Sequence, residues 1–119
     1  MADNRKYYYL KLKENFFDSD SIVLLEDMKD GILYSNILLK LYLKSLKNGG
    51  RLQLDEHIPY TAQMIATLTR HQIGTVERAL AIFQQLGLVE QLDCGRLYMT
   101  DIELRIGQSY TEEERTSDA

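Results

Sequence analysis

The sequence predicts a mainly α-helical domain with a small β-hairpin, an α+β fold, from three observations. Apolar residues recur at spacings of three and four over several segments, which is the periodicity of helices packed on one side. Glycines follow these segments at 31, 49–50 and 87, where helices commonly end. Two short apolar segments are separated by residues 93–96, with Gly95 placed for a hairpin turn. The length of 119 residues suits one domain with its own core.

The N-terminal half contains a predicted strand and two predicted helices. Residues 7–13 are three tyrosines followed by alternating leucine and lysine, a pattern typical of a strand with one face in water. Residues 18–28 begin with aspartates and serines that can cap a helix and continue with an apolar segment. Residues 32–47 predict a long helix covered on more than one side, and residues 51–54 predict one further short strand.

The C-terminal half contains two more helices and the hairpin. Thr61 lies two residues after the only proline and can cap a helix that continues to Leu68. The turn at residues 70–74 leads into a second helix, whose apolar positions are Val76, Ala79, Leu80, Phe83 and Leu86. Residues 88–92 and 97–99 form the hairpin. A short helix, a turn, a second helix and a hairpin make a winged helix-turn-helix, with residues 31–99 as its core and residues 1–28 as an added strand and helix.

Composition and motifs exclude several classes of protein. The chain carries a net charge of −4, with 45% hydrophobic and 27% charged residues, and no apolar run of membrane-spanning length. The start of the chain lacks signal-peptide features and Cys94 is a single cysteine, so we expect a cytoplasmic protein. His57 and His71 have no partners at a metal-ligand spacing, and no glycine loop opens a helix. We therefore expect no enzyme, metal, cofactor or small-molecule substrate.

The second helix of the helix-turn-helix offers the candidate DNA-reading surface. If Val76, Leu80 and Phe83 point inward, the outward positions are Gly74, Arg78, Ala81 and Gln85. Arg78 suits a bidentate contact to guanine, and Gln85 a contact to adenine, in a major groove about 12 Å wide. Further DNA contacts are expected from Thr61, Gln63, Arg70, His71 and Gln72, and from Arg96 at the hairpin tip. Residues 61–99 carry equal numbers of acidic and basic side chains, so on charge alone protein contact is an equal alternative.

Several segments together carry a resemblance to a known family. These are Arg5–Leu12, Phe16–Phe17, Ile58–Thr61, Ala79–Leu80 with Phe83 and Leu86–Val89, and Tyr98–Thr100. With them the chain resembles the N-terminal domain of phage replisome organisers, a family related to DnaD-type primosome proteins and some plasmid replication initiators. The resemblance implies a role in starting replication of a mobile element in a bacterial host, by binding double-stranded origin DNA and recruiting helicase-loading proteins.

The resemblance also implies self-assembly into a dimer or a larger oligomer through the added strand and helix. The candidate interface residues are Tyr7, Tyr8, Tyr9, Leu10, Ile22 and Leu25, for which packing against the long helix is an equal alternative. Two other functions stay open: an assembly scaffold whose DNA binding lies in a further C-terminal region, and a transcriptional repressor. Residues 1–109 are expected to form the domain. Residues 110–119 are expected to be an acidic tail or the start of a linker, with a capping box at 111–114.

Overall fold

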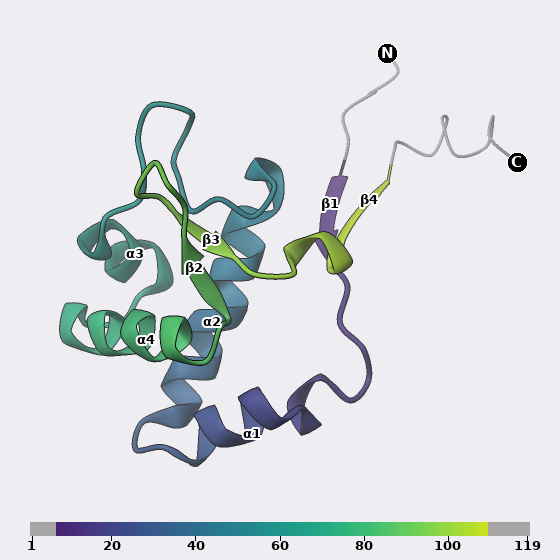
Figure 1. Ribbon diagram of the computed structural model, residues 1–119, viewed down its shortest axis with the longest axis vertical. Helices are drawn as coiled ribbons and strands as arrows, with labels where there is room; N and C mark the ends of the chain where they lie inside the picture. Colours follow the sequence, from purple (N-terminus) through teal and green to yellow (C-terminus); the bar gives the residue numbers. More distant parts are fainter. Residues whose placement is uncertain (1–6, 110–119) are drawn as a thin grey trace, which may run out of the picture.

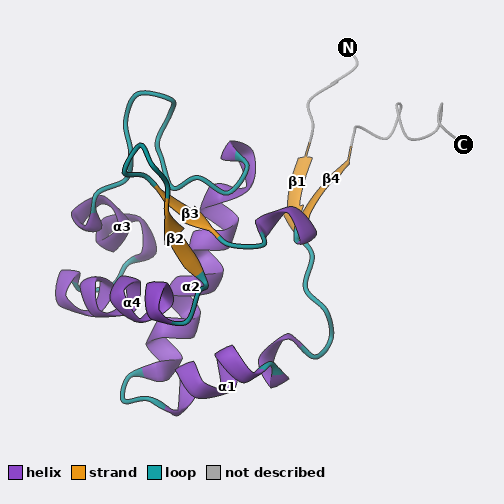
Figure 2. Ribbon diagram, viewed as in Figure 1, coloured by secondary structure: helices purple, strands orange, loops and turns teal. Residues whose placement is uncertain are grey.

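The computed structural model describes residues 7–109 and confirms a mainly helical α+β fold (Figures 1 and 2). Its α-helices are α1 (Asp20–Asp27), α2 (Gly31–Ser45), α3 (Ala62–Thr69) and α4 (Ile73–Gln85). Its strands are β1 (Tyr7–Leu10), β2 (Val89–Gln91), β3 (Leu97–Met99) and β4 (Ile106–Ser109). Three short 3-10 helices are η1 (Phe16–Asp18), η2 (Leu46–Asn48) and η3 (Ile102–Leu104).

The long helix α2 organises the molecule. It contacts α1, α3, α4, β1 and β3, and Figure 1 shows α1 beside one of its ends and α3 and α4 together on one side. Ile37, Leu38, Leu41 and Tyr42 of α2 are buried and lie on one broad side of the helix, whereas Leu43 on the opposite side is exposed by 55%, so the expectation of a helix covered on more than one side is not met. Within residues 7–109, no helix combines the length and the apolar character that crossing a membrane would require.

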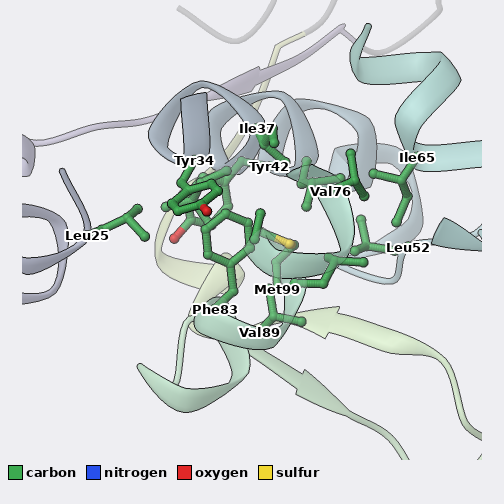
Figure 3. Packing of buried hydrophobic residues seen from close by; sticks show 14 of the residues in the cluster. Leu25, Tyr34, Ile37, Tyr42, Leu52, Ile65, Val76, Phe83, Val89 and Met99 are labelled. Carbon is green, nitrogen blue, oxygen red and sulfur yellow. The ribbon is translucent and has the colours of Figure 1, made fainter. Parts of the chain in front are cut away.

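The hydrophobic core forms where α2 meets α4 and the hairpin (Figure 3). Tyr42, Phe83 and Met99 are almost completely buried and come from α2, α4 and β3. Leu52 reaches the same core from the connection between α2 and α3. Each such side chain contributes about 1.5–3 kcal/mol relative to exposure, so this cluster fixes how α4 sits on α2.

The predicted signals hold at the end of α2 and around α3 and α4, whereas Gly31 is the first residue of α2 and the N-cap residue Ser19 of α1 makes no side-chain capping hydrogen bond. Thr61 Oγ1 accepts a hydrogen bond from the Met64 amide at 3.1 Å and caps α3. Gly49 and Gly87 have φ values of 62° and 75°, a conformation that glycine adopts without strain. Arg70 closes α3 with a φ of 64°, which is uncommon for a residue with a side chain. The ends of α3 and the start of the turn to α4 are therefore encoded locally.

Two antiparallel sheets of two strands each are present, and only one was predicted. In the hairpin, Val89 pairs with Met99 and Gln91 with Leu97. The expected strand at 51–54 is wrong, because residues 51 and 53 form only isolated bridges, to Tyr98 and Pro59. The expected N-terminal strand is shorter and pairs with β4, in the register Tyr7 to Ser109 and Leu10 to Ile106. Figure 2 shows this second sheet apart from the hairpin.

Strand β4 has no clear signal in the sequence. Its segment, Ile106–Ser109, contains a glycine and only one aliphatic residue, and its partner lies near the other end of the chain. The aromatic ring of Tyr9 lies over Gly107 so closely that a side chain at 107 would collide with it. The glycine that weakens the strand pattern is thus required by the packing of the sheet.

Candidate nucleic-acid interface

Helix α4 separates a buried inner face from an exposed outer face. Val76, Ala79 and Phe83 have no exposed surface, and Leu80 is also buried. The outward positions behave as the helical spacing predicts: Arg78, Ala81 and Gln85 are exposed, and Gly74 is half-buried. A row of polar and small side chains on an exposed helix can approach a groove of duplex DNA without a steric obstacle.

The side chain of Arg78 lies over the first turn of α4. Its Nη2 is 3.5 Å from Thr75 Oγ1, and its Nη1 passes within 3.5 Å of the place where a Cβ on Gly74 would be. The N-cap residue Gln72 forms no side-chain hydrogen bond to the helix. The N-terminus of α4 therefore presents a guanidinium and the free amide groups of its first turn together, both of which favour an anionic ligand.

The turn between α3 and α4 is anchored to α2. Lys40 Nζ donates to the Thr69 carbonyl oxygen at 2.8 Å, and His71 Nε2 lies 2.8 Å from Asn36 Oδ1. Burial, and secondarily the charge of Lys40, lowers the pKa of His71 below its usual value. At neutral pH this histidine is therefore uncharged and holds the turn in place. His71 is half-buried, and its expected contact with a phosphate stays a prediction, one in which it would act as a neutral donor; Arg70 in the same turn is exposed.

The N-terminal end of α3 exposes two further predicted contacts. Thr61 and Gln63 are both exposed, and Gln72 at the start of α4 is exposed as well. Thr61 accepts the capping hydrogen bond through its oxygen, so its hydroxyl proton is still available to a phosphate. Helices α3 and α4 thus both begin with exposed polar groups.

The placement of Arg96 corrects its predicted role at the hairpin tip. Its Nη2 donates to the Glu56 carbonyl oxygen at 2.7 Å, and its Nη1 donates to Gln53 Oε1 at 3.3 Å. Arg96 therefore joins the hairpin to the loop at residues 51–60 and is not extended toward solvent. The exposed residues of the tip are Asp93, Cys94 and Gly95, which supply no cation.

The candidate assembly residues divide into two groups. Ile22 and Leu25 are buried in the core of the chain, so their predicted place at an interface between copies is corrected. Tyr8 and Tyr9 are exposed by 37% and 49%, and Leu10 is half-buried against the core. The backbone of Tyr7 lies in β1, and its side chain is outside the described part of the structure.

Sequence reasoning missed two features of this region. Lys40, for which the sequence indicated no contact, donates to the Thr69 carbonyl oxygen and closes the end of α3. Gln53, in a segment expected to be a strand, is buried and receives the Arg96 guanidinium. Both contacts join residues far apart in the chain, for which a single sequence carries no local signal.

The sequence predicts no metal or cofactor site. Among residues 7–109, no three histidine, cysteine or acidic side chains gather closely enough to hold a metal ion. Cys94 is exposed on the hairpin. The predicted capping box at 111–114 lies outside the described residues.

Comparison with known proteins identifies the family of the chain. Neither the search of curated proteins nor the search of solved structures returned a match. The profile of the family described as N-terminal phage replisome organiser matches residues 9–119, which is nearly the whole chain. The match includes all four α-helices and the hairpin, and so agrees with the resemblance found in the sequence. The chain therefore belongs to the N-terminal phage replisome organiser family.

Proposed function

We propose that this domain binds double-stranded DNA at a phage replication origin, in the cytoplasm of a bacterial host, using α3, α4 and the β2–β3 hairpin as a winged helix-turn-helix. The observation that supports the proposal is the outer face of α4, where Arg78, Ala81 and Gln85 are exposed while the inner face is buried. In this proposal the domain acts by binding and not by catalysis.

Each outer position has a chemical role in the proposed complex. Arg78 donates two hydrogen bonds to guanine, and Gln85 both donates to and accepts from adenine. Ala81 and Gly74 allow the helix to approach the base edges closely. Arg70, Thr61, Gln63 and Gln72 contact phosphates and set the register.

The proposal predicts that the affinity for DNA depends only weakly on salt concentration. Only Arg70 and Arg78 supply exposed positive charge from α3, the turn and α4. Because Arg78 contacts guanine and Arg70 is the cation placed on a phosphate, the logarithm of the affinity should fall with the logarithm of the salt concentration with a slope of about 1. Most of the discrimination between sequences should then come from base contacts.

Fluorescence anisotropy with origin duplex and scrambled duplex at low salt tests the proposal. Arg78→Ala should reduce the preference for the origin by about five- to 100-fold, the value of one good bidentate contact. Arg78→Lys should lose most of the same preference, because an ammonium does not form the paired contact. Lys29→Ala, which removes an exposed cation between α1 and α2, is the matched control and should bind as the parent does. Equal affinity of the Arg78 variants and the parent would contradict the proposal.

Assembly with further copies, or with host helicase-loading proteins, is a second candidate function. It is favoured by the β1–β4 sheet, which exposes Tyr8 and Tyr9. Within residues 7–109 the sheet has two strands, and each has one edge without a partner there, where another strand can pair. Removal of residues 1–28 would be a poor test, since it deletes Phe16, Ile22 and Leu25 from the core. Tyr8→Ser, measured by light scattering, keeps the core and the contact between Tyr9 and Gly107, and should lower the mass if this sheet mediates assembly.

A further inference from the structure

The outer face of α1 is aliphatic between two carboxylates. Val23 and Leu24 are exposed by 51% and 57%, although Ile22 and Leu25 in the same helix are buried. Asp20 and Asp27 are exposed as well. The four positions 20, 23, 24 and 27 are spaced so that they lie along one side of a helix. This stripe has the pattern with which a helix anchors itself in a groove of another protein.

Between α2 and α3 lies a surface with aliphatic side chains among cations, where α1 has aliphatic side chains between carboxylates. A pocket of about 360 Å³ there is lined by Lys40, Leu43, Lys44, Leu68 and Arg70. Leu43 is exposed by 55%, and Leu68 is also exposed. Leu68 also lines a second, mostly apolar depression, together with Leu54 and Met64. We call these two adjoining depressions the α2–α3 groove; it has leucines at its centre and cations around it.

The segment that contains α1 is acidic, and the segment that contains part of the groove is basic. Residues 14–30, which include α1, contain six acidic side chains and one lysine. Residues 40–54, which include the C-terminal half of α2, contain four basic side chains and no acidic one. Opposite potentials of this kind favour the encounter of complementary surfaces and fix their register.

We propose that α1 of one copy docks into the α2–α3 groove of another copy. Val23 and Leu24 cover Leu43 and Leu68, while Asp20 and Asp27 lie against the surrounding cations. The inference deepens the assembly part of the proposed function, because it adds a helix-mediated contact to the exposed β1–β4 sheet. The two surfaces differ, so the contact is head-to-tail and extends into a ring or a filament.

A second copy fits the groove better than the other occupants on hand. DNA phosphates would use Lys44 and Arg70 but would leave the leucines in water. The acidic segment at residues 110–119 has suitable charge, but Tyr110 is its only large apolar residue. Of these three candidates, the α1 stripe is the one that offers both aliphatic side chains and flanking carboxylates.

Two variants, each lacking one of the two surfaces, test the proposal in the absence of DNA. One variant, Leu43→Glu with Lys44→Glu, disables the groove; the other, Leu24→Ser with Asp27→Ser, disables the α1 stripe without adding a charge that the altered groove could bind. All four positions are exposed, so both variants should fold, which circular dichroism checks. Sedimentation velocity of the 119-residue chain should give each variant a lower mass than the parent. An equimolar mixture should give twice the mass of either variant and nothing larger. The intact α1 of the groove variant docks into the intact groove of the stripe variant, and the two surfaces that remain are both altered.

The control is Leu104→Glu, which introduces the same change at a leucine exposed by 78% outside both surfaces, and it should assemble as the parent does. Three results would overturn the proposal: a parent chain that is monomeric at every concentration, a mixture with no gain in mass, or variants that assemble like the parent. A Lys44 variant that loses DNA affinity at unchanged mass would make the groove a phosphate contact instead. Because mass is measured without DNA, none of these results bears on the role of Arg78.

Discussion

Helices α1 and α4 pack against the same long helix, yet their outer faces have opposite character. Both bury aliphatic or aromatic side chains on α2, through Leu25 of α1 and Phe83 of α4. Outside, α4 exposes Arg78 and Gln85, whereas α1 exposes Val23 and Leu24. The inner faces thus serve folding alike, and the difference between the outer faces indicates two kinds of partner. Small and polar side chains suit the edges of bases, and aliphatic side chains suit a protein groove.

The largest expected effect is a loss of stability when a core side chain of α1 or α4 is removed. Phe83→Ala should reduce the free energy of unfolding by about 3–5 kcal/mol, and Leu25→Ala by about 2–5 kcal/mol, because both side chains leave cavities in the core. Urea denaturation measures both values. Gln85→Ala on the outer face of α4 should change stability by less than about 0.5 kcal/mol. A Leu25 variant as stable as the parent would mean that α1 is not part of the core.

The next largest effect is a loss of stability when the cation–π contacts of Arg105 are removed. On the α1 side, the Arg105 guanidinium lies 5.2 Å from the ring centroid of Phe16 and 5.3 Å from that of Tyr42. Arg105→Gln should cost about 1–2 kcal/mol, since two partly buried cation–π contacts are lost. Leu104→Ala is the neighbouring control in urea denaturation. Equal stability of the Arg105 variant and the parent would remove these contacts from the account.

A smaller effect is expected at the helix starts of the helix-turn-helix. Thr61→Ala should cost about 1 kcal/mol, because the Met64 amide loses its capping acceptor. Gln72→Ala at the start of α4 should cost less than about 0.5 kcal/mol, because that side chain makes no capping hydrogen bond. Thermal or urea unfolding of the two variants compares them directly. A larger loss for Gln72 would contradict the geometry described for these caps.

The smallest expected effect is a dependence of stability on pH at the α3–α4 turn. Burial lowers the pKa of His71 in the folded chain below the value of 6.5 that it has when unfolded. Its contribution to stability is therefore complete above pH 6.5 and declines as the pH falls through the lower, folded-state pKa. NMR titration of the folded chain should give His71 a pKa below 6.5. A His71 pKa above 6.5 would contradict its place beside Lys40.

Sequence patterns predicted what is encoded over short distances. The caps and glycines around α3 and α4 follow from residues within a few positions, as Thr61 and Gly87 illustrate. The separation of Phe83 from Arg78 follows from helical periodicity alone. The candidate DNA-reading face could therefore be placed without coordinates.

What the sequence did not predict depends on pairing between distant segments. Strand β4 forms because Tyr9 covers Gly107, and the hairpin is joined to the 51–60 loop because Arg96 reaches Glu56. The same limit applies to Ile22 and Leu25, whose apolar character is equally compatible with an interface and with a core. Only the packing of α1 on α2 shows that they are buried.

NMR chemical-shift mapping with origin duplex is the most direct test of the central claim, that the outer face of α4 reads DNA. Addition of the duplex at low salt to the isotope-labelled chain should shift the amides of Arg78, Ala81 and Gln85 and leave those of Val23 and Leu24 unchanged. Shifts confined to α1 and the α2–α3 groove, or no shifts at all, would contradict the account.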